Sequence, residues 1–499
     1  MLSLGIDSGT QSTKTIVLDF ESGEIIASAQ SAYGLIEGLP PGHLEQHPRT
    51  WLDAVELTVA KCLSQIGGRR DEVAAIGVSG QQHGMVALDK HDKPVRPAKL
   101  WCDTSTTDQC AQFEARFGGK HGLIDLAGNA ILPGYTAPKI LWLKQKEPAS
   151  FRATSCFLLP HDYINQWLTG EKRMEYGDAS GTGLLDVKTR EWSRPLMDFI
   201  DPELAGRMPK PETSQKAAGL LRESLRQQWG LAKSPVVSAG GGDNMMGAIG
   251  TGNIAPGIVT ASLGTSGTLC SFATEPVIDG NGEIAAFCDS TDHWLPLVCT
   301  MNVTVATEQA RRLFDWDFAA LEKALFSAPA GCDGLLFLPY LTGERTPNLP
   351  EGSGVYHGLN TGNMQPAHMA RAAAEGATLG LAYGLNRFRE LGIEPAEIRL
   401  TGGGSKSAAW RQIAADVFGV PTVCLASAEG AALGAAIQAC WTYLAENGKT
   451  VPLRDITARL VQVEEPTRAH PNPDCHALYA ALSEKQTGLT RALHSAGYL

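Results

Sequence analysis

The sequence predicts an α/β protein of two domains with a duplicated core, and three observations carry this prediction. The chain of 499 residues is too long for one ordinary core. Apolar strand-like runs, such as 73–80, alternate with amphipathic stretches along it. A strand, a Gly/Ser/Thr turn and a second strand occur at 2–19 and again at 258–273, and aligning Ser8 with Leu263 sets the copies 255 positions apart. We therefore expect two similar halves, with a cleft where the two turns face each other.

Three stretches of the second half have clear helix or strand signatures. Residues 366–392 begin with Pro, end with Gly and carry many small residues, which predicts a long, closely packed helix. Residues 397–419 read as a strand, a triple-glycine loop and a helix. Residues 428–441 predict another small-residue helix, too short to span a membrane. The second half therefore repeats the strand-and-helix alternation of the first.

The amino-acid composition of the chain indicates which kinds of binding partner and which cellular location to expect. The formal net charge is −11 and no Lys/Arg-rich run is present, which argues against nucleic acid or a membrane surface as a partner. The eleven cysteines are scattered without a C-x-x-C pair, a pattern typical of reduced thiols rather than of a disulfide frame or zinc site. The N-terminus enters a strand at once, without a secretory signal. We therefore expect a cytoplasmic protein.

Asp243 stands at the end of three glycines in SAGGGDN, residues 238–244. Adjacent glycines indicate a backbone that bends unusually or that lets another group approach closely. A flexible turn whose Asp caps the next helix explains this stretch equally well when it is taken alone. Other parts of the chain must decide between the two.

Turns rich in Gly, Ser and Thr follow the two equivalent strands at 8–10 and 263–265, and a third glycine cluster stands at 402–404. Such turns can aim several backbone N–H groups at one anion, so together they suit a nucleotide, with two turns for the phosphates and one for the adenosine end. A P-loop is excluded because Tyr443 occupies the required upstream glycine position, and neither glycine cluster has the G-x-G-x-x-G spacing of a dinucleotide site. Asp7 precedes the first turn, where it either caps the turn or has Mg²⁺ between itself and a phosphate.

Three stretches then carry a resemblance to a known family: GIDSGTQSTK at 5–14, SLGTSGT at 262–268 and LTGGGSKSAAWRQIAADVFG at 400–419. They resemble the FGGY-type carbohydrate kinases, which have the actin-like ATPase (ribonuclease H-like) fold. Shorter stretches in the order of that family extend the resemblance over essentially the whole chain: GQQHG (80–84), PGYTAPKILWL (133–143), LLPHDYINQWLTGE (158–171), DASGTGLLDV (178–187), AGGGDN (239–244) and FLPYLTGERTP (337–347). Within the family they look most like the branch that phosphorylates D-xylulose. The loop LWCDTSTTDQC at 100–110 resembles the W-x-D-S-S-T-T form of some members rather than the W-N-D-x-R form of others.

The resemblance implies ATP- and Mg²⁺-dependent phosphorylation of a ketopentose, D-xylulose first, at its terminal hydroxyl to give D-xylulose 5-phosphate. A kinase for another ketose or polyol, such as ribulose or glycerol, stays open, as does an actin- or Hsp70-like ATPase without a sugar substrate. The partners are then the sugar and ATP, with a homodimer as one option for assembly. The implied domains are an N-terminal FGGY domain over 1–243 with the sugar site and first phosphate turn, a C-terminal nucleotide-binding FGGY domain over 244–440, and a helical extension over 441–499 that packs back on the core.

By the same resemblance, Asp243 is the catalytic group that accepts the proton of the sugar hydroxyl. Gln82 and His83 bind the ketose hydroxyls, and Asn244 lies beside the sugar. Asp7 takes part in catalysis by holding Mg²⁺, directly or through water. The implied nucleotide contacts are Gly9, Thr10, Gly264 and Thr265 at the phosphates and Gly402, Gly403 and Ser407 near the adenosine.

Overall fold

The structure of the protein, a computed structural model, describes residues 1–427 and 429–499. The chain divides into two compact units. Unit 1 consists of Met1–Ile254, Ala273–Pro296 and Glu429–Val461, and unit 2 of Ala255–Phe272, Leu297–Ala428 and Gln462–Leu499. Each unit therefore combines segments that are far apart in the sequence.

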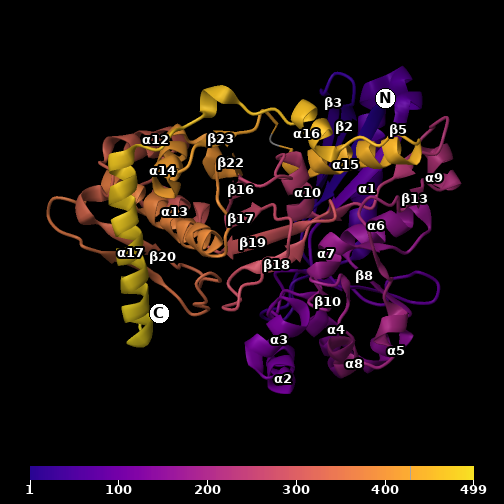
Figure 1. Ribbon diagram of the computed structural model, residues 1–499, viewed down its shortest axis with the longest axis horizontal. Helices are drawn as coiled ribbons and strands as arrows, with labels where there is room; N and C mark the ends of the chain where they lie inside the picture. The colour runs from indigo at the N-terminus through magenta and orange to yellow at the C-terminus, as the bar shows by residue number, and fades with distance from the viewer. Residues whose placement is uncertain (428) are drawn as a thin grey trace. The chain divides into compact units, whose positions relative to one another are not determined.

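A mixed sheet forms the centre of unit 1 (Figure 1). Its strands are β1 (Leu2–Ser8), β2 (Ser12–Asp19), β3 (Ile25–Ala32), β5 (Val73–Gly80), β13 (Gly219–Leu220), β14 (Val236–Val237) and β15 (Gly241–Gly242). β1 pairs antiparallel with β2 and parallel with β5, while β14 and β15 both lie parallel to β5. The strand–turn–strand opening predicted from the sequence is confirmed, and β1, β5 and β15 run in the same direction.

Helices cover both faces of this sheet. α1 (Pro48–Ile66) packs its buried residues with the apolar side chains of β1 and β5 into one core cluster. α15 (Gly430–Glu446) lies on the other face together with α10 (Asp243–Gly250). The strands carry glycine where α15 crosses, because a Cβ added at Gly5 or at Gly77 would lie 2.0 Å from a main-chain oxygen of the helix. The small residues of the sequence therefore set how closely α15 approaches the sheet.

Unit 2 repeats the arrangement. Its central elements are β16 (Ile258–Leu263), β17 (Gly267–Ser271), β22 (Glu397–Thr401), β23 (Thr422–Cys424), α11 (Thr304–Leu313), α13 (Pro366–Glu390), α14 (Ala408–Phe418) and α17 (Pro473–Ser495). β16 pairs antiparallel with β17 and parallel with β22, as β1 does with β2 and β5. The duplicated α/β core predicted from the two equivalent turns is therefore confirmed.

The helices expected in the second half are present. α13 and the β22–α14 pair follow the predicted limits closely. α15 continues to Glu446, beyond the predicted end at 441, because Leu444 is still buried against the core and the first glycine comes at Gly448. α17 packs on α13 and α14 (Figure 1). None of the helices in the described residues is long and apolar enough to cross a bilayer.

Candidate active site

Three parallel strands of unit 1 bring the predicted sugar-binding and base residues to one edge of the sheet. Ser8 is paired with Gly80, and Gly80 with Gly242, so β1, β5 and β15 end side by side. The residues that follow these strands are the turn at 9–10, Gln82–His83 and Asp243–Asn244. Ligand sites of α/β proteins lie at the carboxyl ends of parallel strands.

The three glycines before Asp243 are required by close packing within the protein. Gly240 has φ +72°, a left-handed conformation that favours glycine. A Cβ added at Gly241 would lie 2.3 Å from the Ser290 hydroxyl, and one added at Gly242 would lie 2.6 Å from the Gln82 side chain. The main chain at these glycines is thus packed closely against neighbouring side chains, and α10 begins directly after them, at Asp243.

The carboxyl group of Asp243 has an environment suited to a base. Its Oδ1 accepts hydrogen bonds from the main-chain N of Asn244 at 2.9 Å and from the Asn244 amide at 3.1 Å, and that amide also donates to Gln82 Oε1 at 2.8 Å. Burial, together with the charges of Asp7 and Asp178, raises the pKa of Asp243 to about 7. A carboxylate with a pKa near neutrality can take up a proton at working pH and release it again.

Asp7 lies near the end of β1, half-buried. Its Oδ1 accepts a hydrogen bond from the Ser79 hydroxyl at 2.8 Å. Burial raises the pKa of Asp7, against the opposing effects of Ser79 and Lys14. Asp7 and Asp243 therefore form a pair of neighbouring acids whose charges repel each other. The Asp7 carboxylate fits Mg²⁺, which takes one or two carboxylates and completes its shell with water and phosphate oxygens.

The first turn is held by a network of side chains from elsewhere in unit 1. The Trp101 indole N–H donates to Thr10 Oγ1 at 2.9 Å, and that hydroxyl donates to Gln81 Oε1 at 3.1 Å. The Gln46 amide donates to the main-chain oxygen of Thr10 at 2.7 Å, and the Tyr33 hydroxyl donates to that of Gly9 at 2.8 Å. The carbonyls of Gly9 and Thr10 are thus directed into the protein.

A buried group of charges lies near Gln82, and the sequence alone indicates no role for it. His161 is fully buried, with Nδ1 2.7 Å from Asp178 Oδ2 and Nε2 3.0 Å from Asp162 Oδ1. Although burial opposes it, the two carboxylates hold the pKa of His161 well above its usual value. Burial raises the pKa of Asp178, and His161 and Gln82 lower it. Both His161 and Asp178 belong to stretches that carry the family resemblance, which was the available signal.

The acidic residue Asp103 of the loop at 100–110 is bound by other side chains of the protein. Asp103 lies with His43 and Glu45 in a group that could ligate a metal ion, the one such group among the described residues. The fully buried Lys99 ammonium stands between them, 3.0 Å from Asp103, 3.2 Å from Glu45 and 3.2 Å from His43 Nδ1. The four side chains are therefore a buried ion-pair cluster centred on Lys99.

In unit 2, two of the predicted nucleotide loops lie against each other. β16 and β22 are parallel, so the turn at Gly264–Thr265 and the cluster at Gly402–Gly403 follow neighbouring strand ends. A Cβ added at Gly402 would lie 2.7 Å from the main-chain oxygen of Leu263 and 2.9 Å from the nitrogen of Gly264, and Gly402 has φ +83°. Thr265, Gly402 and Gly403 are all exposed and open to a ligand.

Ser407 has a local structural role. Its hydroxyl is the N-cap of α14, where it accepts from the main-chain N of Trp410 at 3.0 Å and donates to the carboxylate of Glu322. The side chain of Ser407 is therefore engaged by α14 and Glu322, whereas the neighbouring glycines at 402 and 403 are exposed.

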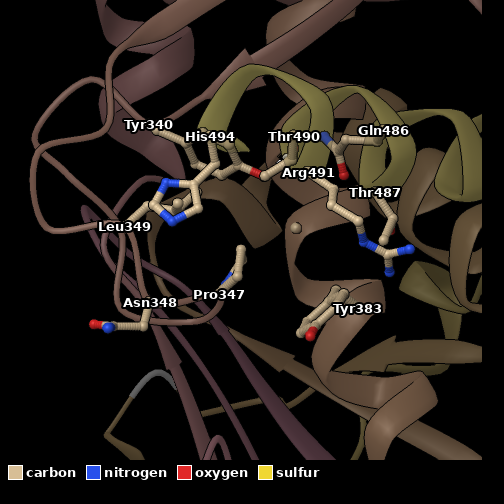
Figure 2. Close-up of a pocket in the computed structure, with 11 residues that line it drawn as sticks. Tyr340, Pro347, Asn348, Leu349, Tyr383, Gln486, Thr487, Thr490, Arg491 and His494 are labelled. Atoms are coloured by element: carbon tan, nitrogen blue, oxygen red, sulfur yellow. Dashed lines mark hydrogen bonds between the residues drawn. The ribbon is translucent and has the colours of Figure 1, made fainter. Parts of the chain in front are cut away.

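A pocket of about 190 Å³ lies elsewhere in unit 2, between α13, α17 and the segment at 340–349 (Figure 2). Tyr340 and Thr490 line it and join their hydroxyls at 3.0 Å, and Tyr383 and Arg491 complete the wall. None of the predicted site residues lines this pocket, so it is no part of the predicted active site.

Comparison with known proteins places these features in a family. Residues 2–250 match the N-terminal domain of the FGGY family of carbohydrate kinases, and residues 259–443 match its C-terminal domain. The chain is 41% identical to the xylulose kinase of Haemophilus influenzae over 94% of its own length and 95% of that protein.

Solved structures agree. A ligand-bound xylulose kinase from Lactobacillus acidophilus superposes with a TM-score of 0.91 at 27% identity, covering 99% of this chain and 98% of the other. A gluconate kinase from the same organism superposes equally well, with a TM-score of 0.91, 27% identity and the same coverage. The two-unit α/β architecture is that of sugar kinases with the actin-like ATPase fold. The chain belongs to the FGGY family of carbohydrate kinases.

Proposed function

We propose that this protein catalyses the ATP-dependent phosphorylation of D-xylulose at its terminal hydroxyl, which gives D-xylulose 5-phosphate and ADP. Membership of a kinase family implies ATP as the donor, and the name of the Haemophilus influenzae relative supports the sugar. The observation that carries the proposal is the carboxyl group of Asp243, whose pKa of about 7 suits a base beside Asn244 and Gln82.

In the proposed reaction the terminal hydroxyl oxygen of the sugar attacks the γ-phosphorus of ATP. The bond from the γ-phosphorus to the β–γ bridging oxygen breaks, ADP leaves, and the hydroxyl proton passes to Asp243. Phosphoryl transfer has a loose transition state, so most of the rate comes from positioning and from neutralising charge, and less from the base. Gln82, His83 and Asn244 orient the ketose hydroxyls.

We assign the nucleotide contacts as the family resemblance implies them. Gly9, Thr10, Gly264 and Thr265 serve the phosphates, while Gly402 and Gly403 serve the adenosine end. For Ser407 the proposal rests on its main chain, because its hydroxyl is used by α14. Mg²⁺ at Asp7, when bound, would neutralise phosphate charge.

The eleven free cysteines are consistent with a reducing, cytoplasmic location. A homodimer and the division of the chain at residues 243 and 440 stay predictions. Size-exclusion chromatography with light scattering tests the dimer, and limited proteolysis tests the division.

The decisive experiment measures ADP release across pentuloses, hexuloses, polyols and gluconate. We expect D-xylulose to give the highest kcat/KM. A higher value with ribulose, glycerol or gluconate would replace the substrate within the same reaction class. ATP turnover that no sugar stimulates would instead support an actin- or Hsp70-like ATPase.

A further inference from the structure

His83 adopts a main-chain conformation that residues other than glycine rarely adopt. Its φ is +63°, in the left-handed region where an L-residue is strained. Position 83 is a histidine although glycine, which adopts this conformation without strain, is the next residue in the chain, at Gly84. Backbone strain of this kind persists where surrounding contacts hold the residue in place, and such residues cluster at functional sites.

The main-chain oxygen of His83 is held by two donors from the beginning of α4 (Thr136–Lys146). Lys139 Nζ donates to it at 2.9 Å, and Thr136 Oγ1 donates to it at 3.1 Å. Lys139 also donates to the main-chain oxygen of Gly134. Its side chain is 0% exposed, and burial lowers the pKa of its ammonium to about 7. A buried ammonium is costly to keep, so its bonds to these two carbonyls carry structural weight.

The imidazole ring of His83 lies in a fitted space. Its centroid is 4.8 Å from the Tyr135 ring and 5.6 Å from the Phe287 ring. A Cβ added at Gly181 would lie 2.5 Å from both Nδ1 and Cε1 of the imidazole. Gly181 has φ −74°, a conformation open to any residue, so the backbone does not require glycine there. The glycine makes room for the ring.

We propose that Lys139, Thr136 and Gly181 are positioning residues that hold His83 in the orientation in which its imidazole contacts the sugar. The inference rests on the proposed function, because it takes His83 as a sugar contact. It gives a physical role to the stretch PGYTAPKILWL, and a second role to DASGTGLLDV, whose Asp178 already pairs with His161. Lys139 and Gly181 act on different parts of His83, one on the main chain and the other on the ring.

Lys139→Met tests the first contact, since it keeps the side-chain length and removes the donors. We expect D-xylulose binding, measured calorimetrically without nucleotide, to weaken tenfold or more, while the KM for ATP changes less than twofold. In a His83→Ala background the same substitution should weaken binding less than threefold, because the ring it positions is gone. Lys144→Met is the matched control on α4: Lys144 also donates to a main-chain oxygen, that of Ile200, and should leave sugar binding unchanged.

Gly181→Ala tests the second contact without removing any hydrogen bond. We expect at least a tenfold loss of D-xylulose affinity in the parent protein and little further loss in the His83→Ala background. Gly206→Ala is the control, because an added Cβ there meets no atom within 4 Å. Thr136→Val removes the weaker donor, should lower affinity by about two- to fivefold, and keeps the test available if Lys139→Met does not fold.

Hydrogen exchange of residues 80–86 in the unliganded protein separates this inference from the choice of sugar. Exchange should be faster in Lys139→Met than in the parent protein or in Lys144→Met. Unchanged exchange, or an equal loss of sugar affinity in the His83→Ala background, overturns the positioning role. If the parent protein binds no D-xylulose, the proposed substrate fails, and the exchange experiment still decides the role of Lys139.

Discussion

The pH dependence of kcat/KM for the sugar should report the titration of Asp243. Burial and the charges of Asp7 and Asp178 disfavour its ionised form and raise its pKa to about 7. The base must be ionised to accept a proton, so activity is lost as the pH falls. With this pKa about nine-tenths of the enzyme is active at pH 8 and just under one-tenth at pH 6, a fall of about tenfold. An aspartate with its ordinary pKa of 3.8 would give a flat profile over the same interval.

Initial rates of ADP formation at fixed free Mg²⁺ and saturating ATP measure this profile, with circular dichroism at each pH as the control for folding. Asp243→Asn should retain the fold and the sugar affinity, lose about 10²–10⁴-fold in kcat, and show no acid limb in its residual rate. A flat profile between pH 6 and 8 in the folded parent protein would refute the assignment of Asp243 as a base that titrates near neutrality.

The remaining predictions concern stability, the metal and the nucleotide. The raised pKa of Asp243 means that its ionised form destabilises the folded state, so Asp243→Asn should raise the Tm at pH 8. This gain in Tm should shrink as the pH falls below about 7 and should be gone below pH 4, which thermal scans at each pH can measure. Asp7→Ala should lower kcat at saturating Mg²⁺ far more than it raises the KM for sugar; a variant with a lowered Tm and full turnover would restrict Asp7 to a structural role. Lys99→Met removes the cation that faces the buried Asp103 carboxylate, whereas Glu45 keeps its ion pair with Arg96; it should cost about 3–5 kcal/mol of unfolding free energy, measured by urea titration. Gly402→Ala should raise the KM for ATP with sugar affinity unchanged, since its Cβ would collide with Leu263; an unchanged KM for ATP would separate this loop from the nucleotide.

The residues at the strand ends could be predicted from the sequence, and the side chains that support them could not. Asp7, Gln82 and Asp243 each follow an apolar run at a turn, and parallel strands bring such positions together whatever the details of the fold. The bond from Trp101 to Thr10 joins residues 91 positions apart and depends on how distant segments pack, which no local pattern records.

Local chemistry can also suggest more than one use for a residue. Ser407 follows a glycine cluster and precedes a helix, so its hydroxyl could serve a nucleotide or cap the helix, and the structure shows it as the cap. The glycines before Asp243 indicate the close approach of another group, and in the structure the groups that crowd them are Ser290 and Gln82 of the protein itself. In both cases the residue type predicts the kind of contact, whereas only the structure identifies the group that makes it.

The place of α15 in unit 1 has a consequence for the synthesis of the protein. β1, the first strand to leave the ribosome, needs α15 against its glycine-bearing face, and that helix ends at Glu446. Nearly nine-tenths of the chain must therefore be translated before the first sheet can be covered, and until then an apolar surface of the nascent chain is open to chaperones and to aggregation. Truncation before residue 430 removes a wall of the N-terminal core rather than a dispensable tail.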